Sequence, residues 1–116
     1  MPRDLQQQQI WIGLAHVVRT ADDSVLPPDA GGAYLHVLAL ASDLEHFQTA
    51  VKAVCDAQRG VRLYELDDME TLLSRLARAT PSKTILAAAD QVEATGELRF
   101  DAAWFTYPLD ERPDNA

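Results

Sequence analysis

Four acidic residues within six positions form the densest group of potential ligand residues in the sequence. They are Glu65, Asp67, Asp68 and Glu70, and no basic residue separates them. Carboxylates at this density could bind Mg²⁺ or Ca²⁺, or could act as an acid/base pair if one of them were desolvated. The segment lacks the glycine turn and the D-x-D-x-D-G spacing of a calcium loop, and acids are also typical of the first turn of a helix. We therefore interpret these acids as the start of a helix and predict no metal site.

The three histidines form a second possible constellation. His16 and His36 lie in two apolar segments, so on neighbouring strands they could face the same side and contact a common ligand. His46 lies where a helix is expected, and no H-x-H, H-E-x-x-H or C-x-x-C spacing connects the three. Two interpretations stay open for His16 and His36: a ligand-binding pair, or two hydrogen-bonded structural residues, which is the more common role for a histidine in an apolar strand.

Other catalytic patterns are missing from the sequence. No serine lies in a G-x-S-x-G setting, and the glycine pair at 31–32 precedes a strand pattern, whereas a phosphate-binding turn precedes a helix. The single cysteine, Cys55, falls at helical spacing among apolar residues, which is typical of a small core residue. The sequence therefore predicts no catalytic residue and no cofactor, and it favours a protein that is not an enzyme.

Composition limits the class of partner. The chain has 116 residues, of which 10 are Lys or Arg and 18 are Asp or Glu, for a formal net charge of −8. Nucleic acids and anionic membranes require clustered basic residues, so we expect neither as a partner, whereas a basic protein surface is compatible with this charge. One cysteine forms no internal disulfide, and the polar residues after Arg3 do not fit a signal peptide, so we expect a cytoplasmic protein.

Apolar periodicity predicts four strands and three helices. The strands are expected at 10–18, 34–41, 61–66 and 97–107. The helices are expected to begin with the capping box at Ser42, with Asp67 and with Pro81, and the last should end near Gly96. The order is β-β-α-β-α-α-β.

This order favours a single α+β domain over residues 10–108, between a flexible N-terminal arm at 1–9 and a polar C-terminal tail at 109–116. We expect a two-layer sandwich with a four-stranded mixed sheet and the helices on one face. The first two strands should pair antiparallel across the 19–32 loop, and the second and third should form a parallel crossover. The other sheet face would then be covered by that loop, by a partner or by a second copy.

The last strand carries a possible interaction surface. Successive residues of a strand point to opposite faces, so Trp104 and Phe105 cannot both enter one core layer. Exposed aromatic side chains beside acids would suit a protein interface. In size, acidity and alternation of strands and helices the chain also resembles bacterial immunity proteins, which inhibit a toxin of the same cell. This resemblance is one of class, without a shared motif, and implies a tight complex with a basic effector.

Three functional hypotheses follow. The first is a small acidic protein-binding module, such as an inhibitor, that contacts its partner through Glu65, Asp67, Asp68, Glu70, Trp104 and Tyr107. The second is a small enzyme or ligand-binding protein with a pocket at the 19–32 loop that uses His16 or His36. The third is a structural homodimer in which two sheets pack face to face.

Overall fold

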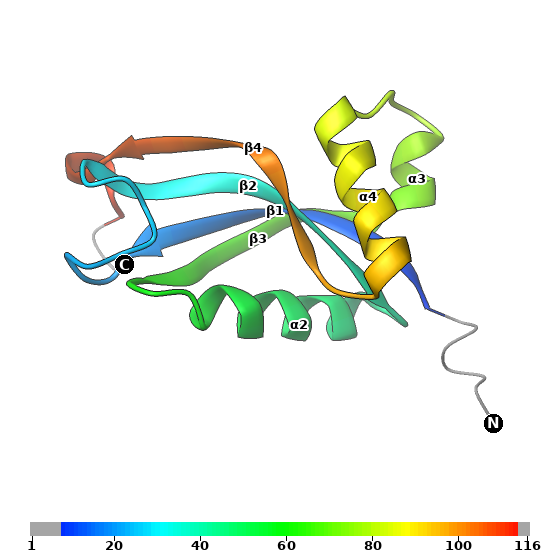
Figure 1. The fold of residues 1–116 in the computed structure, drawn as a ribbon, viewed down its shortest axis with the longest axis horizontal. Coiled ribbons are helices and arrows are strands. Elements are labelled where there is room, and N and C mark those ends of the chain that lie inside the picture. Colours follow the sequence, from blue (N-terminus) through cyan, green and yellow to red (C-terminus); the bar gives the residue numbers. More distant parts are fainter. Residues whose placement is uncertain (1–7, 114–116) are drawn as a thin grey trace.

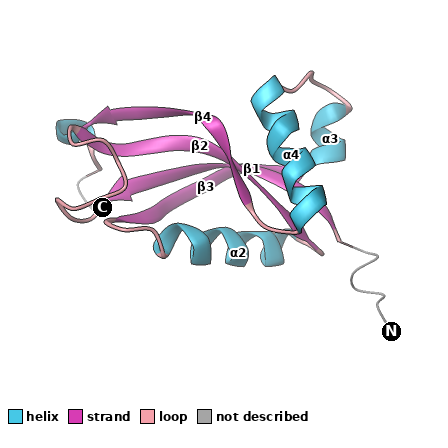
Figure 2. Ribbon diagram, viewed as in Figure 1, coloured by secondary structure: helices cyan, strands magenta, loops and turns pink. Residues whose placement is uncertain are grey.

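The computed structural model describes residues 8–113 and shows a four-stranded sheet with three α-helices (Figures 1 and 2). In chain order the elements are β1 (Gln9–Arg19), β2 (Ala30–Ala41), α2 (Leu44–Asp56), β3 (Val61–Thr71), α3 (Leu72–Leu76), α4 (Lys83–Thr95), β4 (Arg99–Pro108) and the 3-10 helix η1 (Leu109–Glu111). The α+β class and the predicted element order are confirmed. Of the expected arm and tail, residues 1–7 and 114–116 lie outside the described residues.

The sheet is antiparallel throughout, so the prediction of a mixed sheet is wrong. Its strand order is β3-β1-β2-β4, and each of the three neighbouring pairs is antiparallel. The expected hairpin of β1 and β2 across the long loop is confirmed. Because β1 is antiparallel to both β2 and β3, these two strands do run in the same direction, as a crossover requires. They do not pair with each other, because β1 lies between them.

The helices pack on both faces of the sheet, so the prediction that they share one face is also wrong. Phe47, Val51 and Cys55 of α2 are buried in one core cluster with Ala15 and Val37 of the sheet. A second cluster joins α4 to the opposite face; it contains Ile12, Leu38, Ile85, Ala88, Ala89 and Val92. The helices α3 and α4 lie at the end of the sheet where β1 begins, whereas the 20–29 loop and η1 lie at the other end (Figure 1). None of the three α-helices of residues 8–113 covers that other end of the α4 face.

Strand β3 extends through the acids that were expected to begin a helix. Leu14 of β1 pairs with Asp67, and Ile12 pairs with Glu70, with a register shift between the two pairs. The backbone of Asp68 has a φ of 53°, in the left-handed region that accommodates such an irregularity. Helix α3 begins only at Leu72. Pairing with the central strand β1 has therefore prevailed over the local preference of these acids for a helix start.

The ends of the longer helices agree more closely with the sequence. The N-cap of α2 is Asp43, one residue after the predicted Ser42, and its side chain accepts a hydrogen bond of 2.8 Å from the backbone of His46. Helix α4 ends at Gly96, as predicted, with a left-handed φ of 73°. Cys55 is buried, which confirms it as a core residue.

Candidate ligand-binding cavity

A cavity of about 360 Å³ lies on the α2 face of the sheet, next to the 20–29 loop. All four strands contribute to its lining, with the apolar side chains of Val17, Leu35, Val61 and Phe100. These four belong to the same core layer as α2. The cavity forms where α2 ends, because Cys55 in the last turn of the helix is the final α2 residue that lines it.

The loop and the edge strand complete the cavity. Leu26 of the loop is 5% exposed and packs into the core, whereas Val25 and Trp104 line the cavity while remaining 47% and 43% exposed. The cavity therefore has an apolar interior and a rim that includes two exposed apolar side chains. Such a site suits the apolar part of a small molecule.

Few polar side chains line this cavity. Asp101 is 5% exposed, and one of its carboxylate oxygens accepts a hydrogen bond of 3.1 Å from the backbone N–H of Ala103. Gln58 contributes a side-chain amide from just beyond α2. Burial, together with the neighbouring charge of Asp56, raises the pKa of the Cys55 thiol to about 11. The thiol is therefore protonated at neutral pH and is not a nucleophile.

A buried arginine gives the 20–29 loop its shape. Arg19, at the end of β1, is 5% exposed, and its guanidinium donates four hydrogen bonds to backbone carbonyl groups. Nε donates to Ala30 at 2.7 Å, Nη1 to Ala21 and Asp22 at 3.1 and 2.8 Å, and Nη2 to Pro27 at 2.6 Å. The planar fork of arginine can satisfy several acceptors at once, so the loop is fixed around this side chain.

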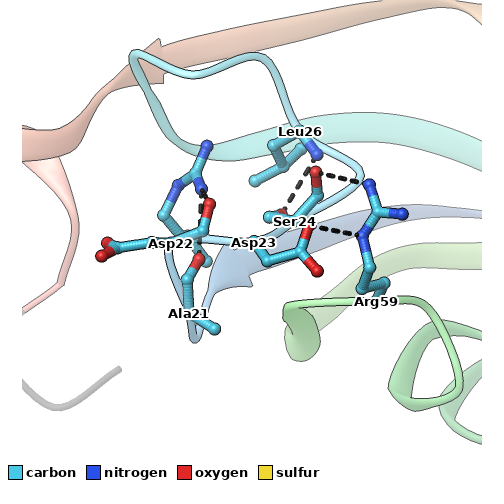
Figure 3. A network of polar contacts seen from close by, with 7 residues as sticks. Ala21, Asp22, Asp23, Ser24, Leu26 and Arg59 are labelled. Atoms are coloured by element: carbon cyan, nitrogen blue, oxygen red, sulfur yellow. Dashed lines mark hydrogen bonds and ion pairs between the residues drawn. The ribbon is translucent and has the colours of Figure 1, made fainter.

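A second set of contacts attaches the loop to the segment after α2 (Figure 3). Arg59 makes an ion pair of 3.0 Å with Asp23 and donates a hydrogen bond of 3.1 Å to the carbonyl oxygen of Ser24. The Ser24 hydroxyl in turn accepts a bond from the backbone N–H of Leu26. These contacts position Val25 and Leu26, the two loop residues of the cavity lining.

The two histidines of the sequence prediction lie on the opposite face and do not line the cavity. His16 pairs with Tyr34 and Leu14 pairs with His36, so both histidines face the same side, two residues apart along the hairpin. Nε2 of His16 forms a hydrogen bond of 2.6 Å with the hydroxyl group of Tyr107, and the His16 ring stacks on Tyr34 with a centroid distance of 4.3 Å.

His16 has the surroundings of a structural residue. It is 6% exposed, and burial lowers its pKa, so the neutral imidazole is favoured. A hypothetical Cβ on Gly32 would lie 2.2 Å from the Tyr107 hydroxyl oxygen, so the absence of a side chain at Gly32 makes room for this tyrosine. The geometry supports the structural interpretation of His16 rather than the ligand-binding one.

The six residues proposed for partner binding lie at both edges of the sheet. The acids belong to the edge strand β3, where Glu70 pairs with Arg75 at 3.2 Å and also with Arg78. Trp104 and Tyr107 belong to β4, at the other edge, and point to opposite faces. Their role in partner binding stays a prediction, and they do not form one continuous surface.

Comparisons with known proteins do not identify a family for this chain. No family model matches the sequence, and no curated protein and no solved structure matches it. Within residues 8–113, no group of three or more His, Cys, Asp and Glu side chains is placed to bind a metal ion, and no helix is long and apolar enough to span a membrane. The functional argument therefore depends on the cavity and its chemistry.

Proposed function

We propose that this protein binds a small, mainly apolar molecule in the cavity between α2, the 20–29 loop and β4. The observation that carries this proposal is an apolar cavity of about 360 Å³ whose lining includes Asp101, an acidic residue that is 5% exposed. Ligand-binding pockets typically have volumes of about 300–1,000 Å³ and combine apolar walls with a few polar groups that orient the ligand. The cavity agrees with that description.

The lining also indicates what the ligand should carry. A carboxylate in apolar surroundings is stabilised by a hydrogen-bond donor or a positive charge. Asp101 receives one such bond from the backbone of Ala103. A ligand with an apolar body and an ammonium or hydroxyl group would supply another, whereas a ligand carboxylate would be repelled.

Thermal unfolding with three probes of equal chain length tests the proposal. Hexylamine should raise the melting temperature most, hexanol less, and hexanoate not at all. A ligand at 100 times its dissociation constant adds about 2.7 kcal/mol to the free energy of unfolding. Asp101→Asn keeps an acceptor oxygen for Ala103 but removes the charge, so it should abolish the preference for the amine over the alcohol.

A blocking variant locates the binding site. Val25→Trp places a large side chain at the cavity rim, from a position that is already 47% exposed, and should remove the response to the probes. Leu86→Trp introduces the same residue at a 43% exposed position in α4 that lines no cavity described for residues 8–113, and it should leave the response unchanged. Equal responses in the two variants would contradict the proposal.

Protein binding is the second candidate function, in the form of an inhibitor or immunity-type role in the cytoplasm. The exposure of Phe105, at 79%, and of Trp104 favours it, because exposed aromatic side chains commonly anchor protein interfaces. Co-precipitation with the wild-type chain, with Trp104→Ala and with a Glu65→Lys, Asp67→Lys variant tests it. A basic protein that is retained by the wild type and lost with both variants is the expected result, and equal retention by all three would contradict this role.

A further inference from the structure

The outer edge of β4 has the properties of a strand that pairs with another strand. β4 is the last strand of the sheet, so the backbone groups on its outer side have no neighbouring strand within the described residues. Residues 102–106 are all exposed. No charged residue occurs from Ala102 to Pro108, although the whole chain carries a formal net charge of −8. An exposed, uncharged and aromatic edge strand favours pairing with another chain.

The opposite edge of the sheet lacks these properties. Strand β3 carries exposed acids, including Glu65, Asp67 and Asp68. Two register shifts interrupt its pairing with β1, and two also interrupt the pairing of β4 with β2. The two edges therefore differ in charge rather than in the number of bulges. Charged side chains on an edge strand oppose pairing between molecules, and the 102–108 segment of β4 has none.

We propose that two copies of this chain pair antiparallel along β4 and form a continuous eight-stranded sheet. An antiparallel pair around a two-fold axis is self-complementary, because each backbone donor of one strand meets the equivalent acceptor of the other. A two-fold axis within 104–106 would use the part of β4 that lies between the register shift after Phe100 and Pro108. Pro108, which has no backbone N–H, would end the pairing.

The charges on either side of this segment suit the antiparallel direction. Arg99 begins β4 and also pairs with Glu97 at 3.2 Å, whereas Asp110 and Glu111 follow β4 in η1. With an antiparallel axis at Phe105, Arg99 of one copy would lie opposite Glu111 of the other. A parallel arrangement would instead bring the acids of both copies together, at an electrostatic cost.

The same symmetry places the two cavities on one side of the joined sheet. The axis of an antiparallel pair is perpendicular to the sheet, so the Trp104 side chains of both copies point to the same face. With the axis at residue 104 or 105 they would be directly opposite or diagonal neighbours, at distances that aromatic rings can bridge. Each Trp104 already lines a cavity, so the second copy would cover the exposed part of its rim.

Sedimentation equilibrium of the full chain, over a range of micromolar concentrations, tests the proposal. The wild type should have twice the mass of the chain. Phe105→Lys and Thr106→Lys place a charge on opposite faces of the same exposed segment, and each should weaken the dimer by at least roughly tenfold in its dissociation constant. The control Leu73→Lys, at an exposed position in α3, should form the dimer as the wild type does.

The two lysine variants also exclude a different dimer. If two sheets packed through the face that carries Tyr34 and Tyr107, Phe105→Lys would dissociate the dimer but Thr106→Lys, on the cavity side, would not. That result would overturn the proposal, as would a wild-type chain that remains monomeric over the whole range. Circular dichroism of each variant confirms that a change in mass does not come from unfolding.

Discussion

The two faces of the sheet differ most at the end next to the 20–29 loop. On the α2 face, the apolar layer stops at Cys55 and leaves a cavity of about 360 Å³. On the opposite face, where none of the described α-helices covers this end, the rings of His16, Tyr34, Tyr64 and Tyr107 lie against one another. At this end of the sheet, the face that carries α2 therefore contains a cavity. The opposite face is filled by aromatic side chains instead of an α-helix.

This difference helps to distinguish a binding site from a cluster of polar residues that only stabilises the fold. The His16 and Tyr107 pair has the residue types of an acid/base site, but its polar atoms bind each other and His16 is buried. The cavity has an ordinary apolar lining, but it offers volume, and the buried residue Asp101 is part of that lining. Available space is the better indicator of binding here.

The prediction with the largest expected effect concerns Phe47, the aromatic side chain that packs α2 against the sheet. Phe47 is fully buried, and its ring stacks on Trp11 with a centroid distance of 6.2 Å. Phe47→Ala should lower the free energy of unfolding by about 3–5 kcal/mol, because it removes buried apolar surface and leaves a void. The same change at the 79% exposed Phe105 should cost no more than about 0.5 kcal/mol at low protein concentration. Urea unfolding of both variants measures the difference, and similar losses would show that α2 is not anchored in this way.

A smaller effect tests whether the opposite face is stabilised by its hydrogen bond. Tyr107→Phe removes the hydroxyl group and leaves Nε2 of His16 buried without its partner, so the expected loss is about 1–3 kcal/mol. Tyr34→Phe keeps the ring that stacks on His16, at a position that is 40% exposed, and should change the stability by no more than about 0.5 kcal/mol. If Tyr107→Phe is as stable as Tyr34→Phe, the hydrogen bond does not contribute to this face.

The smallest effect is a pH dependence confined to the histidine face. Burial lowers the pKa of both His16 and His36 from the ordinary value of 6.5, and the charge of Arg75 further lowers that of His36. Nearby carboxylates partly oppose this lowering: Asp67 at His16, and Asp101 and Asp68 at His36. The unfolded chain therefore takes up protons first as the pH falls below 6.5, so the stability contributed by the neutral histidines is lost in that range. Urea unfolding at about pH 7.5 and about pH 5.5 should show a lower stability at the acidic value.

His36→Gln provides the control for this pH dependence. It removes one of the two titrating groups from a half-buried position, so the decrease between the two pH values should become smaller. An unchanged decrease would assign the pH dependence to other groups. Acidic side chains such as Asp56, whose pKa is lowered chiefly by its hydrogen bond to Lys52, lose their contribution at lower pH than the histidines.

The sequence predicts the elements well because local patterns determine them. Alternation and helical spacing identify four strands and three helices in the correct order, and α4 ends near Gly96, as predicted. Local patterns do not show which side of a sheet a helix will cover. The apolar residues on both alternating faces of β1 and β2 were the available signal, since such strands are covered on both sides.

The candidate site is only partly predictable. The length of the 19–32 loop indicates a pocket beside it, and the structure has a cavity there. The histidines were expected to line it because they are the chemically conspicuous residues. Asp101 was not among the residues that the sequence singled out. Leu35 pairs with Trp104 and Val37 with Phe100, so β4 contains extra residues that break simple alternation. A bulge formed by two distant strands leaves no mark on local periodicity.

Arg19, at the end of β1, also affects where a protease can cleave the chain. Proteases need an extended segment that can leave the surface, and long connections usually supply one. The carbonyl groups of Ala21, Asp22 and Pro27 cannot turn outwards without breaking their bonds to the Arg19 guanidinium. The exposed connection 77–80, between α3 and α4, lacks such an internal attachment to a buried cation, so limited proteolysis should nick the chain there and spare its longest loop.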